Sequence, residues 1–210
     1  MSAVASGAPS TKSVQTQQKL IEAGITLFSK NGYPATSTRM VQVAAGVQRN
    51  LITYHFGSKE EFWKACMAEL FARIQRVLEP AISQARDIEP TERIRFLIRQ
   101  HVRASAAHPE SIRIMFDEGR CADWRLEYLV DTYVRDFYRS VLELYESGTK
   151  HGVVAEISVV QFYYVLVGGT AVFAMAPECE LLTGEDAFSA EMIDAQANAI
   201  ADLLVRDPAG

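Results

Sequence analysis

Apolar residues recur every three or four positions along nearly the whole chain, whereas runs that alternate between apolar and polar residues are almost absent. This spacing predicts an all-α protein. The first apolar face covers residues 20–28 and should end at Asn31 and Gly32, which favour a helix C-terminus. A short second helix should follow, capped by Thr36 or Ser37 and ended by Gly46.

Longer helices are predicted downstream of this short helix. Residues 58–61 read S-K-E-E, a capping box that predicts a long helix reaching Leu78 and stopped by Pro80. Apolar spacing then predicts further helices around residues 94–102, 112–116, 124–147 and 192–204. We find no internal repeat and no long linker between them.

Residues 157–177 carry no charged side chain, and 21 residues is the length that can span a bilayer. A lone spanning helix normally has basic or aromatic anchors at its ends, but here the flanks are Glu156, Glu178 and Glu180. Gln161 also interrupts the segment. We therefore expect a helix buried on all sides and no membrane partner, with a spanning helix as the alternative.

The composition, with 49% hydrophobic and 22% charged residues, is ordinary for a soluble globular protein. The formal net charge of -5 is unevenly spread. Up to Lys59 there are six basic residues against one acidic residue, about +5, which leaves about -10 for the rest. Such asymmetry indicates a module that binds a charged partner, fused to a more acidic domain.

Three widely separated cysteines without a C-x-x-C motif indicate reduced thiols and a cytoplasmic protein rather than a disulfide frame or a zinc site. Residues 1–12 are small and polar, so we expect a disordered leader and no signal peptide. The predicted domains are this leader, a small helical module over residues 13–58, and a larger helical domain over residues 59–207.

The stretch VAAGVQRNLITYHFGSKEEF, residues 43–62, has the outline of a helix-turn-helix: a short helix, a turn through Gly46, a second short helix and a capped third. Gly46 can adopt the left-handed conformation of a tight turn. We place Gln48, Arg49 and Asn50 in the outward-facing first turn of the second helix. There arginine can pair with guanine, and asparagine or glutamine with adenine, at about 1–3 kcal/mol of discrimination per good pair.

Two sets of DNA contacts are predicted from this placement. The expected base contacts are Gln48, Arg49, Asn50 and Tyr54. Hydroxyl, imidazole and basic side chains suit phosphate oxygens, and the expected phosphate contacts are Thr36, Thr38, Arg39, Thr53, His55 and Lys59. The alternative is a purely structural helical hairpin, in which Tyr54 and Phe56 are core aromatics.

This stretch resembles the N-terminal DNA-binding domain of the TetR family of bacterial transcriptional regulators. The resemblance rests on AAGV at residues 44–47, YHF at 54–56, SKEEF at 58–62 and LFSKNGYPATS at 27–37. Gln42, Leu51 and Thr53 depart from the usual pattern, in which a phosphate-contacting tyrosine is common at the position of Thr53. The resemblance implies that residues 48–50 meet base edges.

The resemblance further implies that residues 13–58 are the helix-turn-helix DNA-binding domain and that residues 59–207 are a helical ligand-binding and dimerisation domain. It implies a homodimer that binds a near-palindromic operator and releases it when a small molecule enters the C-terminal domain. A charge-free helix has no solvent face, which supports a dimer independently. Small residues allow close helix approach, and the last helix has an apolar stripe. The expected interface residues are Gly168, Gly169, Ala171, Met192, Ile193, Ile200 and Leu203.

Six side chains between the middle helices are candidates for an effector pocket, with plain core packing as the alternative: Met115, Phe116, Trp124, Tyr128, Tyr133 and Phe137. Arg113, His101 and Arg120 can either recognise an anion or lie on a solvated face, and we favour the solvated face. The rival function is an enzyme. Because the chain lacks catalytic motifs, phosphate-binding glycine loops and metal-ligand clusters, we predict no catalytic residues, no metal and no cofactor.

Overall fold

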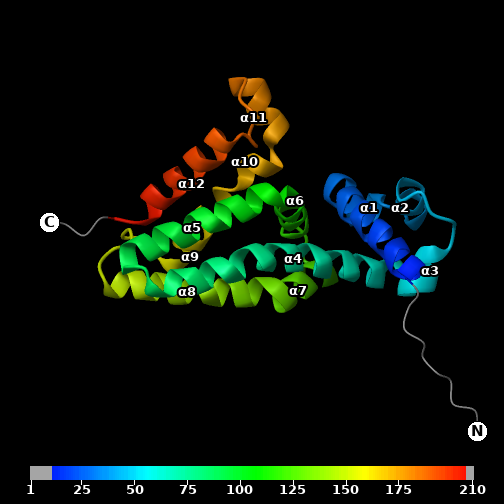
Figure 1. Ribbon diagram of the computed structural model, residues 1–210, viewed down its shortest axis with the longest axis horizontal. Coiled ribbons are helices and arrows are strands. Elements are labelled where there is room, and N and C mark those ends of the chain that lie inside the picture. Colours follow the sequence, from blue (N-terminus) through cyan, green and yellow to red (C-terminus); the bar gives the residue numbers. More distant parts are fainter. Residues whose placement is uncertain (1–10, 207–210) are drawn as a thin grey trace, which may run out of the picture. The chain divides into compact units, whose positions relative to one another are not determined.

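The computed structural model describes residues 11–206, and the regular elements of this part are helices (Figure 1). The all-α prediction is confirmed. The β-pairing in the described residues is one isolated antiparallel bridge between Val154 and Val205. The chain divides into two compact units, residues 1–70 and residues 71–210, which we describe separately.

Three helices and the start of a fourth build the smaller unit: α1 (Thr11–Ala35), α2 (Thr38–Ala44), α3 (Leu51–Phe56) and α4 (Lys59–Gln84). The backbone of α1 is broken at Gly32, whose φ of 75° and ψ of 165° are not helical. Gly32 therefore interrupts the helix as expected. The expected leader lies mostly outside the described residues, but its last two residues, Thr11 and Lys12, already belong to α1.

The core of the smaller unit forms where α1 meets α4. Leu20 and Phe28 of α1 are buried with Phe62 and Trp63 of α4. Gly24 permits this approach, because a Cβ there would lie 2.6 Å from Phe62 Cζ. Val41 of α2 and Ile52 of α3 are also fully buried, as expected for residues that hold the two short helices together.

Helix α4 runs from the smaller unit into the larger one and is longer than predicted. It passes through Pro80 and ends at Gln84, so the expected stop at Pro80 is wrong. Proline removes one backbone hydrogen bond, but Ala81 and Ala85 are buried beyond it and keep the last turn packed. The units divide after Leu70 rather than at Ser58, because the first turns of α4 complete the smaller core.

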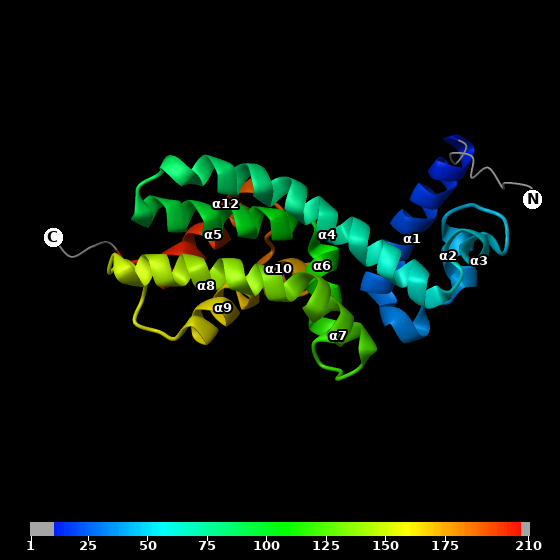
Figure 2. The ribbon, with the colours of Figure 1, turned by 90° about the horizontal axis from the view of Figure 1, so that it is seen from below.

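The larger unit begins with the rest of α4 and continues through ten further elements. In chain order these are η1 (Ala85–Asp87, a 3-10 helix), α5 (Pro90–Ala107), α6 (Pro109–Glu118), α7 (Trp124–Leu129), η2 (Val130–Val134, a π-helix), α8 (Arg135–Lys150), α9 (Val159–Gly168), α10 (Ala171–Ala174), α11 (Ala176–Thr183) and α12 (Ala190–Leu204). Helix α5 is central and packs against α12, α8 and α6, and Figure 2 shows α5 and α8 side by side.

The core of the larger unit is a single cluster drawn mainly from α5, α8, α9 and α12. Its buried members include Ile98 and Val102 of α5, Phe162 of α9 and Ile200 of α12. The chain end is tied to this core. Ala155 N–H donates to the carbonyl of Leu204, Arg206 N–H donates to the carbonyl of Val153, and the buried Arg95 pairs with Asp202.

The uncharged segment is not one helix buried on all sides, so that expectation is wrong. It forms α9, α10 and the start of α11, and the chain bends at Met175, whose φ of -107° and ψ of 24° are not helical. Val160 is 51% exposed and Tyr164 is 66% exposed. No single described helix is long and apolar enough to cross a membrane; Val159–Ala174 and Ala176–Thr183 qualify only together, and they are bent by 73°.

Candidate functional site

The turn between α2 and α3 is held by two left-handed residues. Gly46 has a φ of 64° at the end of α2, and Val47 N–H donates to the carbonyl of Gln42 over 3.1 Å. Asn50 has a φ of 66° at the N-cap of α3, and its carbonyl accepts from Tyr54 N–H over 2.9 Å. The turn is thus closed on both sides by backbone hydrogen bonds.

The predicted base-contacting residues lie close together but not as expected. Gln48 and Arg49 stand in the turn, and α3 begins only at Leu51, so their placement in the first helical turn is wrong. The physical reason is the left-handed backbone of Asn50, which no α-helix can contain. Gln48, Arg49 and Asn50 are all exposed, and Tyr54 is 80% exposed.

The two aromatics flanking His55 differ in burial. Phe56 is half-buried and its ring lies 5.0 Å from that of Phe62, so it belongs to the core. Tyr54 points away from the core. The core alternative therefore applies to Phe56, while Tyr54 keeps a free face next to the turn.

Four of the predicted phosphate contacts keep exposed or partly exposed side chains. Arg39 and Thr53 are exposed, and Thr38 and His55 are half-buried. His55 Nδ1 lies 3.3 Å from Gln17 Nε2 of α1, which fixes the orientation of its ring. These four remain candidates for contact with a DNA backbone.

Thr36 and Lys59 instead hold the end of α1. The side chain of Thr36 is fully buried, and its hydroxyl donates to the carbonyl of Gly32 over 2.8 Å, so a phosphate contact by this side chain is ruled out. Lys59 Nζ donates to the carbonyl of Tyr33 over 2.6 Å and lies 4.1 Å from the centre of the Tyr33 ring. The break at Gly32 leaves carbonyls that need such partners.

Sequence reasoning missed two exposed apolar residues beside the turn. Val43 is 73% exposed and Met40 is 40% exposed, although both lie on α2. Apolar side chains on a DNA-binding surface can contact the methyl group of thymine. Their signal was in the sequence, since Val43 falls two positions after the buried Val41 and so on the opposite face of a helix.

The candidate effector residues do not form one cluster. Tyr133, in the π-helical η2, stacks on Phe71 of α4 with ring centres 4.2 Å apart, and its hydroxyl lies 3.5 Å from that of Tyr128. Burial raises the pKa of Tyr133, so it stays protonated. Met115 and Trp124 are half-buried, and Phe116 is 40% exposed. Only Phe137 packs against the main core.

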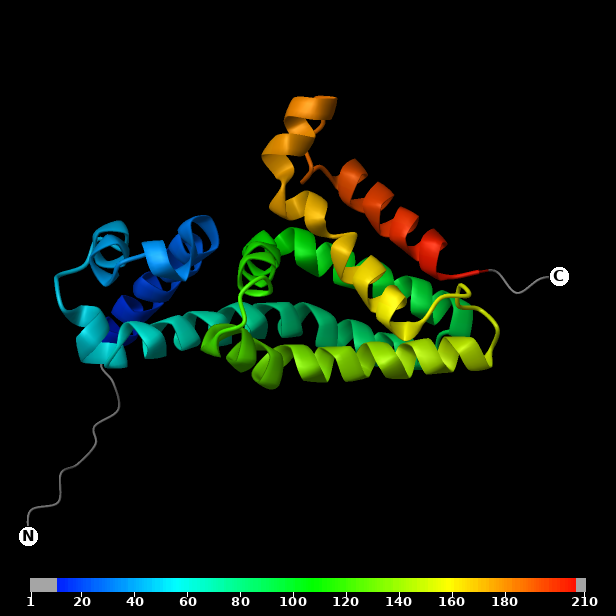
Figure 3. The same ribbon diagram turned by 180° about the vertical axis from the view of Figure 1, so that it is seen from behind.

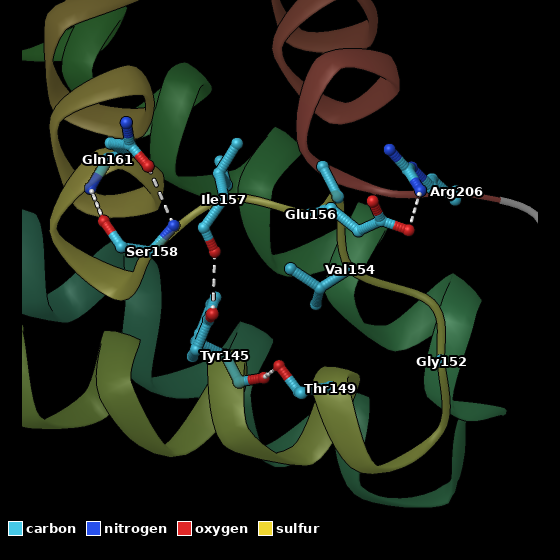
Figure 4. A pocket seen from close by; sticks show the side chains of 10 residues that line it. Tyr145, Thr149, Gly152, Val154, Glu156, Ile157, Ser158, Gln161 and Arg206 are labelled. Carbon is cyan, nitrogen blue, oxygen red and sulfur yellow. Dashed lines mark hydrogen bonds and ion pairs between the residues drawn. The ribbon is translucent and has the colours of Figure 1, made fainter.

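A pocket of about 400 Å³ lies elsewhere, between the end of α8, the start of α9 and Arg206 (Figure 4). Its polar side chains satisfy one another. Tyr145 donates to the carbonyl of Ile157, Ser158 and Gln161 form a capping box, and Arg206 pairs with Glu156. None of the six predicted aromatic and methionine residues lines this pocket.

His101 of α5 packs inside the larger unit, contrary to the sequence-based prediction. It was expected on a solvated face, but its Nε2 atom is sealed from solvent and has no hydrogen-bond partner. Its ring stacks on Phe137, with centres 5.1 Å apart and planes at 18°. Burial lowers the pKa of His101 to about 4, so the ring is neutral at physiological pH. Its position one helical turn after Ile98, beside Val102, was the available signal.

The two arginines considered with His101 have partners inside the larger unit. Arg113 of α6 donates to the carbonyls of Ala174 and Phe173, over 3.4 and 3.5 Å. Arg120 pairs with Asp117 on the surface. Arg113 is thus a link between α6 and α10 rather than part of a solvated face.

The expected interface residues separate into inner and outer groups. Ile200 is buried, and a Cβ on Gly169 would lie 2.5 Å from Ile200 Cδ1, so these two pack within one protomer and are removed from the expected interface. Ala171, Met192 and Ile193 are half-buried. Gly168 is exposed and Leu203 is 67% exposed.

Several exposed apolar residues near this interface were not predicted. They are Val160 and Tyr164 of α9, with Leu181 and Leu182 of α11, which are 88% and 78% exposed. Figure 3 shows α11 projecting from the rest of the larger unit. For Val160 and Tyr164 the available signal was the uncharged composition of residues 157–177, which was expected to be buried within the protein. Leu181 and Leu182 lie beyond that segment.

A tight turn between two short helices, with exposed polar residues on the turn and the second helix, defines a helix-turn-helix protein. Residues 20–66 match the model of the bacterial regulatory proteins of the tetR family. The N-terminal module of the chain therefore belongs to this family of transcriptional regulators.

Similar proteins agree with this assignment. The chain is 27% identical over 142 residues to the HTH-type transcriptional repressor KstR2 of Rhodococcus jostii (strain RHA1), covering 64% of this chain and 65% of that protein. It is 24% identical over 121 residues to YttP of Bacillus subtilis (strain 168), covering 58% of each. The matches therefore span less than two thirds of these relatives.

The fold is shared with solved structures. One is the crystal structure of HlyIIR, a hemolysin II transcriptional regulator, with a TM-score of 0.67, 17% sequence identity, and coverage of 90% of this chain and 99% of that chain. At this identity the similarity concerns the fold alone.

Proposed function

We propose that this protein is a ligand-responsive transcriptional regulator that binds DNA as a homodimer, represses transcription in the cytoplasm, and leaves its operator when a small molecule binds. The observation that carries the proposal is the exposure of Gln48, Arg49 and Tyr54 on the turn and α3 of a tetR-family helix-turn-helix. The relative KstR2 is named a repressor, which supports repression.

DNA reading is assigned to the turn and phosphate binding to the residues around it. The guanidinium of Arg49 can form two parallel hydrogen bonds with a guanine edge, and Gln48 and Asn50 suit adenine. Arg39, Thr38, Thr53 and His55 surround them in sequence and suit phosphate oxygens. The charge of about +5 up to Lys59 favours approach to DNA, although the whole chain is acidic.

Dimerisation is assigned to the exposed apolar residues of three helices of the larger unit: Val160 and Tyr164 of α9, Leu181 and Leu182 of α11, and Leu203 of α12. An apolar surface of this kind on α9, α11 and α12 is typical of a surface that pairs with another copy. A two-fold pair matches a near-palindromic operator, with recognition elements about 34–36 Å apart for half-sites one DNA turn apart.

Effector response is assigned to the larger unit. Helix α4 is continuous from Lys59 to Gln84 and so belongs to both units. An effector that favours one arrangement of the larger unit would then change DNA affinity, and DNA would change effector affinity by the same factor, typically worth about 1–3 kcal/mol.

The experiment is fluorescence anisotropy with labelled DNA fragments selected from the genome by binding to the wild-type protein. The test variant is Arg49→Ala, Asn50→Ala, and the matched control is Arg139→Ala, which removes an exposed arginine of the larger unit. We expect loss of selective binding in the test variant only, and a log-log salt slope of about -0.9 per phosphate contacted. Failure of the selection to enrich any sequence, or equal binding by all three proteins, would sink the proposal.

A further inference from the structure

Two buried side-chain atoms in the described part of the chain lack a hydrogen-bond partner: Gln42 Oε1 in the smaller unit and His101 Nε2 in the larger one. Gln42 keeps one bond, because its Nε2 donates to the carbonyl of Thr38. A buried polar atom without a partner costs stability, since it has lost its hydrogen bonds to water. Such an atom calls for an explanation.

The surroundings of His101 are aromatic. Its ring stacks on Phe137 of α8, and the Phe137 ring lies 6.1 Å from that of Tyr163 on α9. Tyr163 is half-buried, and burial raises the pKa of its hydroxyl. His101 of α5, Phe137 of α8 and Tyr163 of α9 therefore form a chain of three neighbouring rings.

His101 as a residue is half-buried, so other atoms of this residue contact solvent although Nε2 does not. Phe137 lies three residues after the end of the π-helical turn η2, and π-helical turns occur frequently at functional sites. The pocket of Figure 4 offers no such group, because its polar side chains are already paired.

The charges around α5 restrict the kind of ligand. Arg95 pairs with Asp202, Arg99 donates to Asn198, and Arg103 pairs with Asp194, so these three arginines of α5 are directed to α12. The fourth arginine of α5, Arg93, donates to Ser147 of α8. An anionic ligand at His101 would find a neutral ring and no described counter-charge. Burying an uncompensated carboxylate is strongly unfavourable.

We propose that His101 Nε2 binds the hydrogen-bonding group of the effector, and that the effector is a neutral, largely apolar ring compound with one hydroxyl or carbonyl group. This inference rests on the proposed function only in that the ligand at His101 is the molecule that regulates DNA binding. The ligand ring packs beside Phe137 and Tyr163, and its single polar group supplies the partner that Nε2 lacks. A hydroxyl donates to Nε2 in one tautomer, and a carbonyl accepts from it in the other.

The test uses three probes with one ring system: 2-naphthol, naphthalene and 2-naphthoate. Their affinities for the full chain are measured by fluorescence titration. The critical quantity is the ratio of naphthalene to 2-naphthol dissociation constants, compared between wild type and His101→Phe. We expect this ratio to fall at least tenfold in His101→Phe, and we expect 2-naphthoate to bind wild type more weakly than 2-naphthol.

A matched control separates His101 from other polar aromatics. Tyr145→Phe removes a hydroxyl that bonds to the carbonyl of Ile157 and should leave the ratio within about threefold of wild type, which is less than one hydrogen bond contributes. Should His101→Phe fail to fold, His101→Leu replaces it with the same expectation. An unchanged ratio at position 101, an equal fall in Tyr145→Phe, tighter binding of 2-naphthoate, or no binding of either neutral probe would overturn the proposal.

Operator binding, measured on the same preparations without probe, separates this inference from the proposed function. If wild type shows the expected ratio but binds no DNA, the proposed His101 site stands and the proposed regulatory function is wrong. If wild type binds DNA but the ratio does not depend on His101, the regulatory function stands and the proposed site is wrong. We expect 2-naphthol to weaken operator binding by wild type at least fivefold and not by His101→Phe; binding without any effect on DNA would overturn the effector role.

Discussion

The two units of this protein differ in the exposed residues that are most prominent. In the smaller unit Arg49 and Tyr54 are exposed beside the turn, and the apolar Val43 is exposed with them. In the larger unit the most exposed large apolar side chains are those of Leu181 and Leu182. Among its described residues, each unit also holds one buried side-chain polar atom without a partner, Gln42 Oε1 in the smaller and His101 Nε2 in the larger. The first surface suits a charged partner, whereas exposed leucines are typical of a surface that another protein covers.

Charge reversal at the turn gives the largest expected effect in this comparison. Arg49→Glu should weaken operator binding at least a hundredfold, because each half-site loses a base contact of about 1–3 kcal/mol and gains repulsion from phosphate. Anisotropy with selected DNA measures the loss. The thermal unfolding midpoint should not change, since Arg49 is exposed; unchanged affinity would remove the turn from the DNA surface.

Acidification tests the sealed imidazole. The pKa of His101 falls from 6.5 to about 4 on folding, so below pH 6.5 the unfolded state binds more protons than the folded state. Stability from the neutral ring is complete above pH 6.5 and is lost as pH falls toward 4, by about 3 kcal/mol. Denaturant unfolding at several pH values should show that the unfolding free energy of wild type falls between pH 6.5 and pH 4 by this amount more than that of His101→Phe. Parallel pH profiles would contradict the burial.

The exposed leucines test the proposed dimer interface. Leu182→Asp should raise the dimer dissociation constant at least tenfold, because a carboxylate would replace a buried interface side chain. Analytical ultracentrifugation measures the constant. The matched control is Val43→Asp, at a residue of similar exposure in the smaller unit, which should leave dimerisation unaffected. Equal dissociation of both variants would argue against an interface on α11.

Two neighbouring glycines separate the inner and outer sides of the α9 terminus. A Cβ on Gly169 would lie 2.5 Å from Ile200 Cδ1, whereas one on Gly168 would meet nothing within 4 Å. Gly169→Ala should cost about 1–3 kcal/mol of unfolding free energy through overpacking. Gly168→Ala should be neutral or stabilising by up to about 1 kcal/mol. Chemical denaturation measures the unfolding free energy of both variants. A lower stability of Gly168→Ala than of Gly169→Ala would refute the packing of Gly169 against Ile200.

Asn50 gives the smallest expected effect and separates backbone from side chain. Its φ of 66° makes Asn50→Ala unfavourable by about 1 kcal/mol, while Asn50→Gly tolerates the same backbone. If its amide also reads adenine, both variants lose selectivity at one base pair. Sequence selection with each variant, together with its thermal midpoint, distinguishes the two contributions.

The fold and the motif were readable from the sequence because they depend on local spacing. Apolar periodicity predicts the helices, and Gly32 and Gly46 mark the breaks that the backbone shows. The exact start of α3 was not readable, since Asn can be helical or left-handed and only the folded turn decides. Thr36 looked like a free hydroxyl, but the carbonyl it binds becomes available only when α1 breaks at Gly32.

Tertiary contacts explain the remaining errors. A composition without charges did not reveal which side of α9 faces its own core, so Ile200 and Tyr164 could not be assigned to inside and outside. Nor could spacing show that His101 lies under Phe137, because that contact joins residues 36 positions apart on α5 and α8. Nor could spacing show the neighbours of the candidate effector residues, because Tyr133 packs against Phe71 of α4 and Phe137 packs against His101 of α5.

The closure of the larger unit by its last described residues has a practical consequence for anyone who produces this protein. Val205 forms the bridge with Val154, and its carbonyl accepts from the buried Arg95 over 3.3 Å. Affinity tags and fluorescent fusions therefore belong beyond Arg206, joined through a spacer that leaves this bridge intact. A fragment cut before Asp202 would lose the carboxylate that pairs with Arg95, so shortening the chain there to aid crystallisation would yield material that aggregates rather than crystallises.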